Sequence, residues 1–471
     1  MKSYSWAILL IGMLGILVLG ATPYAGGWND GSRLASVEML ADHHTLRIDD
    51  SIFCRPSAES IAAGIAPYPA DRADLLQDGT KDKLFIDGHF YSDKPALITF
   101  AMAGVYRLAC VLGMPTATER PDWFCRVMTI TTSGVAYALT VWALFSLGGL
   151  LRLTASMRLL WVMSFALATF ALSYTRHVNN HVVQMASVAW ICVHIVRLAQ
   201  ERELGIINGW RLFLLGNLAG LTFNLDLGSG PLLVVGLFAL VTYRCQRFLP
   251  VALFVLATAP WIIAGMGVNY AIGGVLKPMN MVPEYSVWPG GPFTPENLTG
   301  FSRHTAIEYP TYLIELMAGK KGYLLHNLPL LLTLPAMVMI FRRETRYRAE
   351  LGFAMGWCFA TWLLYGWLSN NYGGACCSVR WFVPFLVPGY FLVGTLLQRH
   401  PEYRREFLIL TAWGCVMAAL MWWRGPWAMK MVPMYWAIVG GALIHWGIAW
   451  RARHLMGRRA PNMPQSPRMA A

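Results

Sequence analysis

The chain has 471 residues, of which 56% are hydrophobic and only 13% are charged. A soluble protein of this length would carry about a quarter charged residues, so the composition excludes an ordinary soluble domain and favours a polytopic membrane protein. Lys and Arg outnumber Asp and Glu by 38 to 25. Because such an excess collects in the cytoplasmic loops of membrane proteins, we do not read it as a sign of a nucleic-acid partner.

Apolar runs of membrane-spanning length recur along the chain and alternate with clusters of arginine. Placing every arginine cluster on the cytoplasmic side predicts about 12 transmembrane helices with both termini cytoplasmic. We therefore expect one all-α integral membrane domain over residues 1–471, with a basic cytoplasmic tail at 452–471. The predicted spans lie near residues 5–21, 125–150, 158–174, 183–199, 210–224, 230–243, 248–267, 323–341, 351–368, 381–397, 406–422 and 431–449.

Four loops then share the outer face of the membrane. The first is long, residues 22–124, and the second is short, residues 174–181. The third covers residues 268–322, and the fourth covers residues 370–380. Polar residues are concentrated in these loops, whereas the inner loops are short and basic. We therefore expect the chemistry on the outer face of the membrane.

The apolar stretch at residues 96–113 is left out of the predicted spans. Counting it would move the next arginine cluster to the outer face. It also carries Arg107 near its centre, and an arginine there costs roughly 2.5–3.5 kcal/mol on membrane-insertion scales. We therefore expect an interfacial or re-entrant helix on the outer face. An ordinary span in which Arg107 reaches the interface remains the alternative.

The first outer loop opens with a predicted amphipathic helix over residues 32–42, in which apolar residues recur at helical spacing. We expect this helix to lie on the membrane. Asp30 stands at its N-terminal edge, just outside the first span. The simplest interpretation is that Asp30, Asn29 or Ser32 caps the helix. A cap can also be catalytic, because the helix end holds the carboxylate at a set height above the bilayer.

The segment KLFIDGHFYS alternates apolar and polar residues around Asp87-Gly88, which predicts a β-hairpin. The hairpin leads to Asp93, Lys94 and Pro95, and Pro95 suits the first position of a helix. Lys94 would then lie beside the free backbone donors of a helix N-terminus, where anions bind readily. Lys94 is therefore a candidate phosphate ligand, and a lipid-headgroup anchor is the alternative.

These features together resemble a known family. Asp30 to Ala35 reads DGSRLA, and Lys94 to Leu97 reads KPAL before an apolar helix. This order resembles the polyprenyl-phosphate-sugar-dependent glycosyltransferases of the GT-C type, such as bacterial protein O-mannosyltransferases and the lipid A aminoarabinose transferase. Those often read Asp-Glu-x-Arg-Tyr-Ala and Lys-Pro-Pro-Leu at these places. The family's Glu is Gly31 here, and residues 175–181 lack the carboxylate that many members carry.

The resemblance implies transfer of a sugar from a polyprenyl-phosphate donor to a hydroxyl of a lipid, glycan or protein acceptor. Asp30 would be the base, giving inversion at the sugar carbon. Lys94 would hold the phosphate, joined by Arg176 or Arg380. Further candidates for substrate contact are Arg33, His89, Asp93, His177 and His181. The sequence indicates no set of metal ligands and no certain cofactor, and it leaves a divalent metal as an unsupported option.

Two other classes of protein fit part of the pattern. A secondary transporter would have a similar number of helices and ionisable residues within them, and Asp226 between two short spans is the nearest such feature. A non-catalytic scaffold that keeps the GT-C architecture would explain the loss of the Glu at Gly31. Transfer of a labelled sugar by the purified protein would separate the three.

Overall fold

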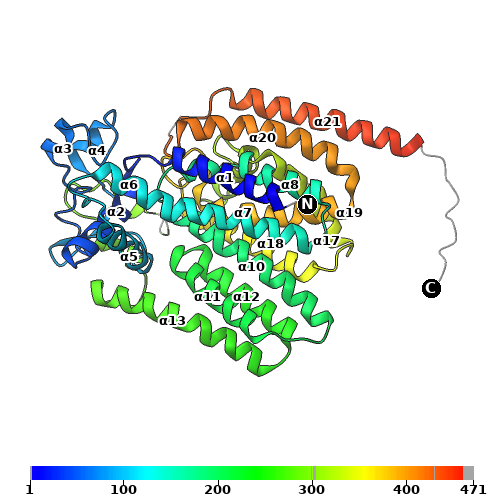
Figure 1. Cartoon of the computed structure of the whole chain (residues 1–471), viewed down its shortest axis with the longest axis horizontal. Coiled ribbons are helices and arrows are strands. Elements are labelled where there is room, and N and C mark those ends of the chain that lie inside the picture. The colour runs from blue at the N-terminus through cyan, green and yellow to red at the C-terminus, as the bar shows by residue number, and fades with distance from the viewer. Residues whose placement is uncertain (1–2, 299, 301–303, 429, 460–471) are drawn as a thin grey trace.

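The computed structural model describes residues 3–298, 300, 304–428 and 430–459. Long helices run side by side, and the segments between α1 and α6 gather at one end of this bundle (Figure 1). The first turn of α1 and the last turn of α21 lie toward the opposite end. One end of the bundle therefore carries the longest connecting segment, and the other carries both ends of the described chain.

The longer helices of the bundle are α1 (Ser3–Gly20), α6 (Pro121–Thr129), α7 (Val135–Leu150), α8 (Ala155–Leu167), α10 (Asn180–Glu203), α11 (Gly209–Leu225), α12 (Ser229–Cys245), α13 (Phe248–Gly273), α17 (Thr333–Phe341), α18 (Arg348–Leu368), α19 (Leu386–Arg399), α20 (Arg404–Arg424) and α21 (Tyr435–Arg459). A π-helical turn η1 (Ile130–Gly134) joins α6 to α7, and short 3-10 helices η4 (Leu328–Leu332), η5 (Arg380–Phe385) and η6 (Pro401–Tyr403) precede α17, α19 and α20. The connecting segments contain α2 (Trp28–His43), α3 (Ala58–Ala62), α4 (Ala73–Asp78), α5 (Leu97–Val111), α9 (Ala171–Tyr174), η2 (Met279–Met281), α14 (Pro283–Ser286), η3 (Pro295–Asn297), α15 (Glu308–Ala318) and α16 (Tyr323–His326).

Each of the predicted spans falls on helical segments of the structure. Within the described residues, six helices are by themselves long and apolar enough to cross a membrane. A seventh is counted if Glu308–His326 and Leu328–Phe341, which bend by 109° at their junction, form one span. Helices α11 and α12 have 17 residues each, a rise of roughly 25 Å against a core of about 30 Å. The count of 12 transmembrane helices therefore stays a prediction.

Helix α5 occupies the stretch that we left out of the spans. Its 15 residues rise about 22 Å, which is short of the ~30 Å hydrocarbon core. It packs against α2, and Arg107 is exposed together with the apolar side chains of Phe100 and Leu108. An exposed face of this kind suits a helix at the membrane interface.

Helix α2 differs from its prediction. It begins at Trp28 instead of residue 32, and most of its residues are buried on every side. The neighbouring loops, α5 and the β-hairpin enclose it, so it is not a helix with one face on the membrane and one in water. The periodicity of Leu34, Val37 and Leu40 describes only the face against the core, since Ser32, Ser36 and Glu38 are also buried.

The predicted hairpin is confirmed. Strand β1 (Lys83–Ile86) pairs antiparallel with β2 (His89–Ser92), with Lys83 opposite Ser92. Asp87 and Gly88 both have positive φ, 49° and 83°, as a two-residue type I′ turn requires.

Two predicted loop boundaries change. Helix α13 continues into the predicted third outer loop as far as Gly273, and this loop contains the helical segments η2, α14, η3 and α15. Residues 452–459 of the predicted basic tail are the last turns of α21. The rest of that tail, residues 460–471, lies outside the described residues.

Candidate active site

Polar side chains from the first, second and fourth predicted outer segments contact one another. The first segment supplies Asp30 on α2 and Lys94 after the hairpin. The second supplies His177 just before α10, and the fourth supplies Arg380 at the start of η5. The contacts among these segments make them one candidate site.

Lys94 lies between two carboxylates. Its Nζ donates to Asp82 Oδ2 at 2.7 Å and to Asp93 Oδ2 at 2.6 Å, and its side chain is 10% exposed. Burial raises the pKa of Asp82, but the charge and hydrogen bond of Lys94 outweigh burial and lower it overall. Burial raises the pKa of Asp93, and Lys94 offsets this only in part. One cation thus serves two acids of unequal acidity.

Lys94 does not lie at a helix N-terminus. Helix α5 begins at Leu97 with Ala96 as its N-cap, so Pro95 precedes the helix instead of opening it. The position of Lys94 is set by the hairpin, which brings Asp82 opposite Asp93. The prediction that free backbone donors of a helix flank Lys94 is therefore wrong. Two carboxylates hold its ammonium group instead.

Asn29 connects Lys94 to Arg380. With its amide oxygen oriented by the hydrogen-bond network, Asn29 accepts from Lys94 Nζ and from Arg380 Nη1, each at 3.1 Å. The guanidinium of Arg380 lies 5.7 Å from the ring centre of Trp427. Its Nε is buried without a hydrogen-bond partner among the described residues.

Arg33 is a buried cation that lacks a counter-ion in direct contact. Its residue is 5% exposed, its Nε has no hydrogen-bond partner, and no carboxylate of the described residues forms an ion pair with it. Burial lowers the pKa of Arg33 to about 10, Asp93 opposes this shift, and the charge of Arg380 adds to it. Two guanidinium groups that repel each other in a buried place favour the binding of an anion.

Asp30 is the third residue of α2 and not its N-cap, which is Gly27. The carboxylate is 1% exposed. Its Oδ2 accepts from the backbone N–H of Gly26 at 2.7 Å, and Oδ1 accepts from that of Gly27 at 3.0 Å. Oδ2 also lies 3.1 Å from Nδ1 of His177. The helix start therefore holds the carboxylate in one orientation beside the imidazole.

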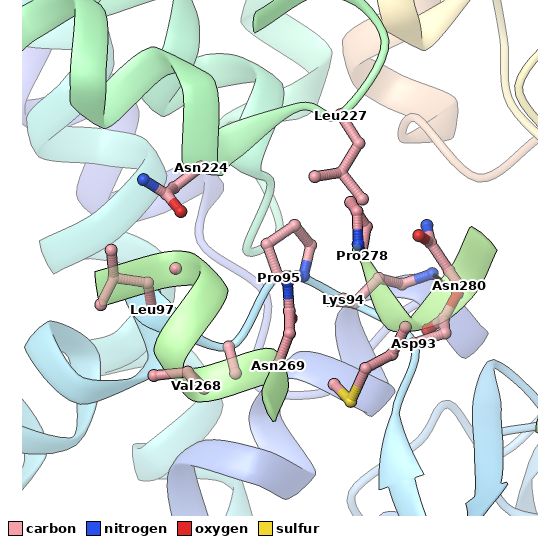
Figure 2. Close-up of a pocket in the computed structure, with 13 residues that line it drawn as sticks. Asp93, Lys94, Pro95, Leu97, Asn224, Leu227, Val268, Asn269, Pro278 and Asn280 are labelled. Atoms are coloured by element: carbon pink, nitrogen blue, oxygen red, sulfur yellow. Dashed lines mark hydrogen bonds and ion pairs between the residues drawn. The ribbon is translucent and has the colours of Figure 1, made fainter. Parts of the chain in front are cut away.

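A cleft opens beside Lys94. It encloses about 380 Å³ of empty space, solvent at its mouth included, between the start of α5, the ends of α11 and α13, and residues 278–280. Figure 2 shows Lys94 and Asn280 toward one side of the cleft and Asn224 and Leu97 toward the other. Oδ1 of Asn280 is buried without a hydrogen-bond partner in the described chain. The side-chain amides of Asn224, Asn269 and Asn280 therefore line the cleft together with the ammonium group of Lys94.

Two of the predicted site residues lie apart from this cluster. Nη1 of Arg176 donates to the carbonyls of Trp422 at 2.6 Å and Trp423 at 3.0 Å, at the end of α20. His89 lies on β2, where its Nδ1 is 3.4 Å from Asp49 Oδ2 and its side chain is 41% exposed. These contacts fit a helix-capping arginine and a surface ion pair, and neither residue joins the cluster around Lys94.

His181 lies in the first turn of α10, where Asn179 caps the helix by accepting from the His181 N–H at 2.9 Å. Its Nδ1 is 3.4 Å from Asp226 Oδ2. The His181 ring is also near enough to Arg380 for the charge of that guanidinium to act on it. Oδ1 of Asp226 accepts from Ser229 N at 2.7 Å and from Tyr365 OH at 2.8 Å. Asp226 therefore braces the turn between α11 and α12.

Within the described residues, no group of three or more His, Cys, Asp and Glu side chains is arranged to hold a metal ion. The nearest pair of site carboxylates, Asp82 and Asp93, binds the ammonium group of Lys94. This donor set does not fit a divalent metal, and we assign no chemical step to one.

Three residues of the site were missed in the sequence. They are Asn29, Asp82 and Trp427. The two-residue turn at Asp87-Gly88 could have revealed Asp82, because the same register that pairs Lys83 with Ser92 places Asp82 opposite Asp93. Nothing in the sequence around Trp427 marks it, since it reaches the site only through the packing of α20.

Comparison with known proteins gives no matching family model and no similar curated protein. Among solved structures, the chain is similar to ArnT from Cupriavidus metallidurans bound to undecaprenyl phosphate, with 13% identity and a TM-score of 0.48 over 97% of this chain and 79% of that one. The apo state of ArnT gives 13% identity and a TM-score of 0.49 over 97% of this chain and 78% of that one.

An oligosaccharyltransferase from Archaeoglobus fulgidus in its apo form gives 11% identity and a TM-score of 0.44, over 96% of this chain and 56% of that one. These neighbours belong to the GT-C glycosyltransferases, the class that the sequence resembles. At such TM-scores they carry no part of the functional proposal, which rests on the contacts of the site.

Proposed function

We propose that this protein is a membrane glycosyltransferase that moves a sugar from a polyprenyl-phosphate donor to an acceptor hydroxyl. The observation that carries the proposal is the buried guanidinium of Arg33 without an ion-pair partner among the described residues. A buried charge is costly unless something compensates for it. A phosphate ester supplies that compensation, because the planar guanidinium binds phosphate oxygens through two parallel hydrogen bonds.

The charges around Arg33 support a phosphate that gains charge during the reaction. Arg33, Lys94 and Arg380 are cations, and Asp82 and Asp93 both pair with Lys94. The three cations exceed these two carboxylates by one positive charge. When a sugar leaves a lipid phosphate, the phosphate oxygen takes the electron pair of the broken bond, and fixed donors in a buried place stabilise it strongly.

The base side of the site adjoins the phosphate side along α2. Asn29 contacts Lys94 and Arg380, and the next residue, Asp30, contacts His177. A hydroxyl activated beside Asp30 would attack the sugar while the phosphate departs toward Arg33 and Lys94. Attack and departure on opposite faces of the anomeric carbon invert its configuration, so we propose an inverting single displacement.

The arrangement of the bundle supports a location for this reaction. We propose that the end with α2 faces the outside of the inner membrane and that both termini are cytoplasmic. The first turn of α1 and the last turn of α21 lie away from α2, as this orientation requires (Figure 1). The donor and a lipid, glycan or protein acceptor would then meet at the outer surface, with membrane lipids around α5.

The contacts of Asp226 weaken the transporter alternative. This carboxylate was the nearest sign of an ion pathway, and it instead holds a turn through Ser229 and Tyr365. The scaffold alternative explains the loss of the Glu at Gly31, but it gives no reason for keeping a buried, unmatched Arg33.

Sugar transfer by the purified protein tests the proposal. The protein in lipid nanodiscs is mixed with a polyprenyl-phosphate sugar carrying a radiolabel and with an extract of outer-leaflet acceptors. We expect label to move to the acceptor fraction and unlabelled polyprenyl phosphate to accumulate in equal amount. Uptake of label into proteoliposomes without transfer would favour a transporter, and neither result would favour a scaffold.

A further inference from the structure

We propose that His177 accepts the proton of the attacking hydroxyl through its Nε2, and that Asp30 acts as the positioning residue for this imidazole. The inference rests on the proposed sugar transfer and reassigns the base within it. In this assignment Nε2 of His177, and not the carboxylate of Asp30, is the group that contacts the acceptor hydroxyl.

The hydrogen bonds around His177 assign its tautomer. Nδ1 lies 3.1 Å from Asp30 Oδ2 and 3.1 Å from Thr22 Oγ1. The hydroxyl of Thr22 has one hydrogen, which it donates to the carbonyl of Arg176 at 2.9 Å or of Tyr24 at 3.0 Å. Both neighbours of Nδ1 are therefore acceptors, so Nδ1 carries the hydrogen. In the neutral ring this leaves the lone pair on Nε2.

Asp30 is placed to orient the ring and not to meet substrate. Its carboxylate is 1% exposed, against 6% for the His177 side chain, and it accepts from two backbone N–H groups while Oδ2 lies 3.1 Å from Nδ1 of His177. The backbone of His177 is fixed too, because Ser133 Oγ donates to its carbonyl at 2.7 Å. A buried carboxylate that holds Nδ1–H so that Nε2 can act as a base is the arrangement by which acids orient catalytic histidines.

The far edge of the imidazole faces Gly26 and Trp427. A Cβ at Gly26 would collide with Cδ1 of Trp427 and Cε1 of His177, and would lie 2.9 Å from Nε2. Glycine therefore lets the imidazole and the indole approach. Trp427 in turn lies under the guanidinium of Arg380, and its Nε1 is buried without a partner in the described residues. One indole thus connects the base to the phosphate side of the site.

The proposed step moves one proton and exchanges one bond of the anomeric carbon for another. The acceptor O–H bond breaks, and its proton goes to Nε2 of His177. The oxygen forms a bond to the anomeric carbon as the bond from that carbon to the phosphate oxygen breaks. The phosphate leaves with the electron pair and is stabilised by Arg33, Lys94 and Arg380. The imidazolium is stabilised by Asp30, and it later returns its proton to water.

His177→Asn separates this assignment from a base role of Asp30. The amide nitrogen of Asn can take the place of Nδ1 and keep its contacts with Thr22 and Asp30, while Nε2 is removed. We expect transfer by this variant to fall about 10²–10⁴-fold in kcat, with Tm close to wild type. Adding Asp30→Asn in the same chain should then change kcat by only a few-fold, because residues that act as one unit are not additive.

Transfer by His177→Asn within about tenfold of wild type, or a further loss of about 100-fold on adding Asp30→Asn, would make Asp30 the base and overturn the inference. If the Tm of His177→Asn falls, His177→Ala is assayed with added imidazole. Recovery of kcat supports the inference, and no recovery overturns it. A wild-type protein without any transfer would overturn the proposed function itself, and the base assignment with it.

Discussion

Arg33→Met is expected to lower sugar transfer at least about 10²-fold, the usual loss when one donor to a developing oxyanion is removed. The same change should leave Tm unchanged or raise it. Arg33 is buried, lacks an ion pair among the described residues, and its pKa is lowered to about 10 by burial. Methionine fills a similar volume without the cost of burying a charge.

Opposite effects on activity and stability identify a cation that is kept for binding and not for folding. The measurement is kcat/KM for transfer beside a thermal melt of the protein in detergent. Arg55→Gln is the matched control, because Arg55 lies in the same loop with a 71% exposed side chain. Unchanged transfer, or a clear loss of Tm, would show that Arg33 has a structural role instead.

Lys94→Met is expected to abolish transfer and also to destabilise the protein. Removing the ammonium leaves Asp82 and Asp93, whose side chains are 14% and 25% exposed, without their shared partner. Breaking a fully buried ion pair from one side costs about 3–5 kcal/mol, and this partly exposed trio should cost less. A loss of activity in this variant would therefore have two causes, which a single substitution cannot separate.

The variant that combines Lys94→Met, Asp82→Asn and Asp93→Asn separates them. It removes the two carboxylates together with the ammonium group of Lys94, so we expect its Tm to return toward wild type while transfer stays lost. Lys81→Met is the control, since Lys81 pairs with Asp78 nearby in the same segment. Recovery of transfer in the triple variant would mean that Lys94 only balances the two carboxylates.

The pH dependence of stability tests the ion pairs of Lys94 with Asp82 and Asp93. Lys94 lowers the pKa of Asp82 in the folded protein despite burial. A lowered folded-state pKa contributes stability at neutral pH that is lost as the pH falls through that pKa. The difference in Tm between wild type and Lys94→Met should therefore shrink in acid.

The positions of the helices could be predicted because hydropathy and arginine clusters record them directly. The hairpin followed from Asp87-Gly88, whose positive φ angles a tight turn demands. The enclosure of α2 could not be predicted in the same way. Its apolar spacing fits a helix with one buried face, and only the packing of distant loops buries Ser32 and Glu38 as well.

The site was predictable in its parts and not in its connections. Asp30, Lys94, Arg380 and His177 were all candidates, but their sequence contexts could not tell them from Arg176, which caps α20 instead. Which arginine reaches the cluster depends on contacts between segments far apart in the chain, such as that of Asn29 with Arg380. Local motifs carry no record of such contacts.

The position of a bound phosphate tests the central claim most directly. A structure of the protein in nanodiscs with a polyprenyl phosphate would locate the phosphorus atom against the side chains of α2 and η5. We expect the phosphate oxygens within hydrogen-bond distance of Arg33 and Arg380, with Lys94 turned from Asp93 toward the phosphate. A phosphate bound instead at Arg176, with Arg33 still unpaired, would contradict the assignment of this cluster as the lipid-phosphate site.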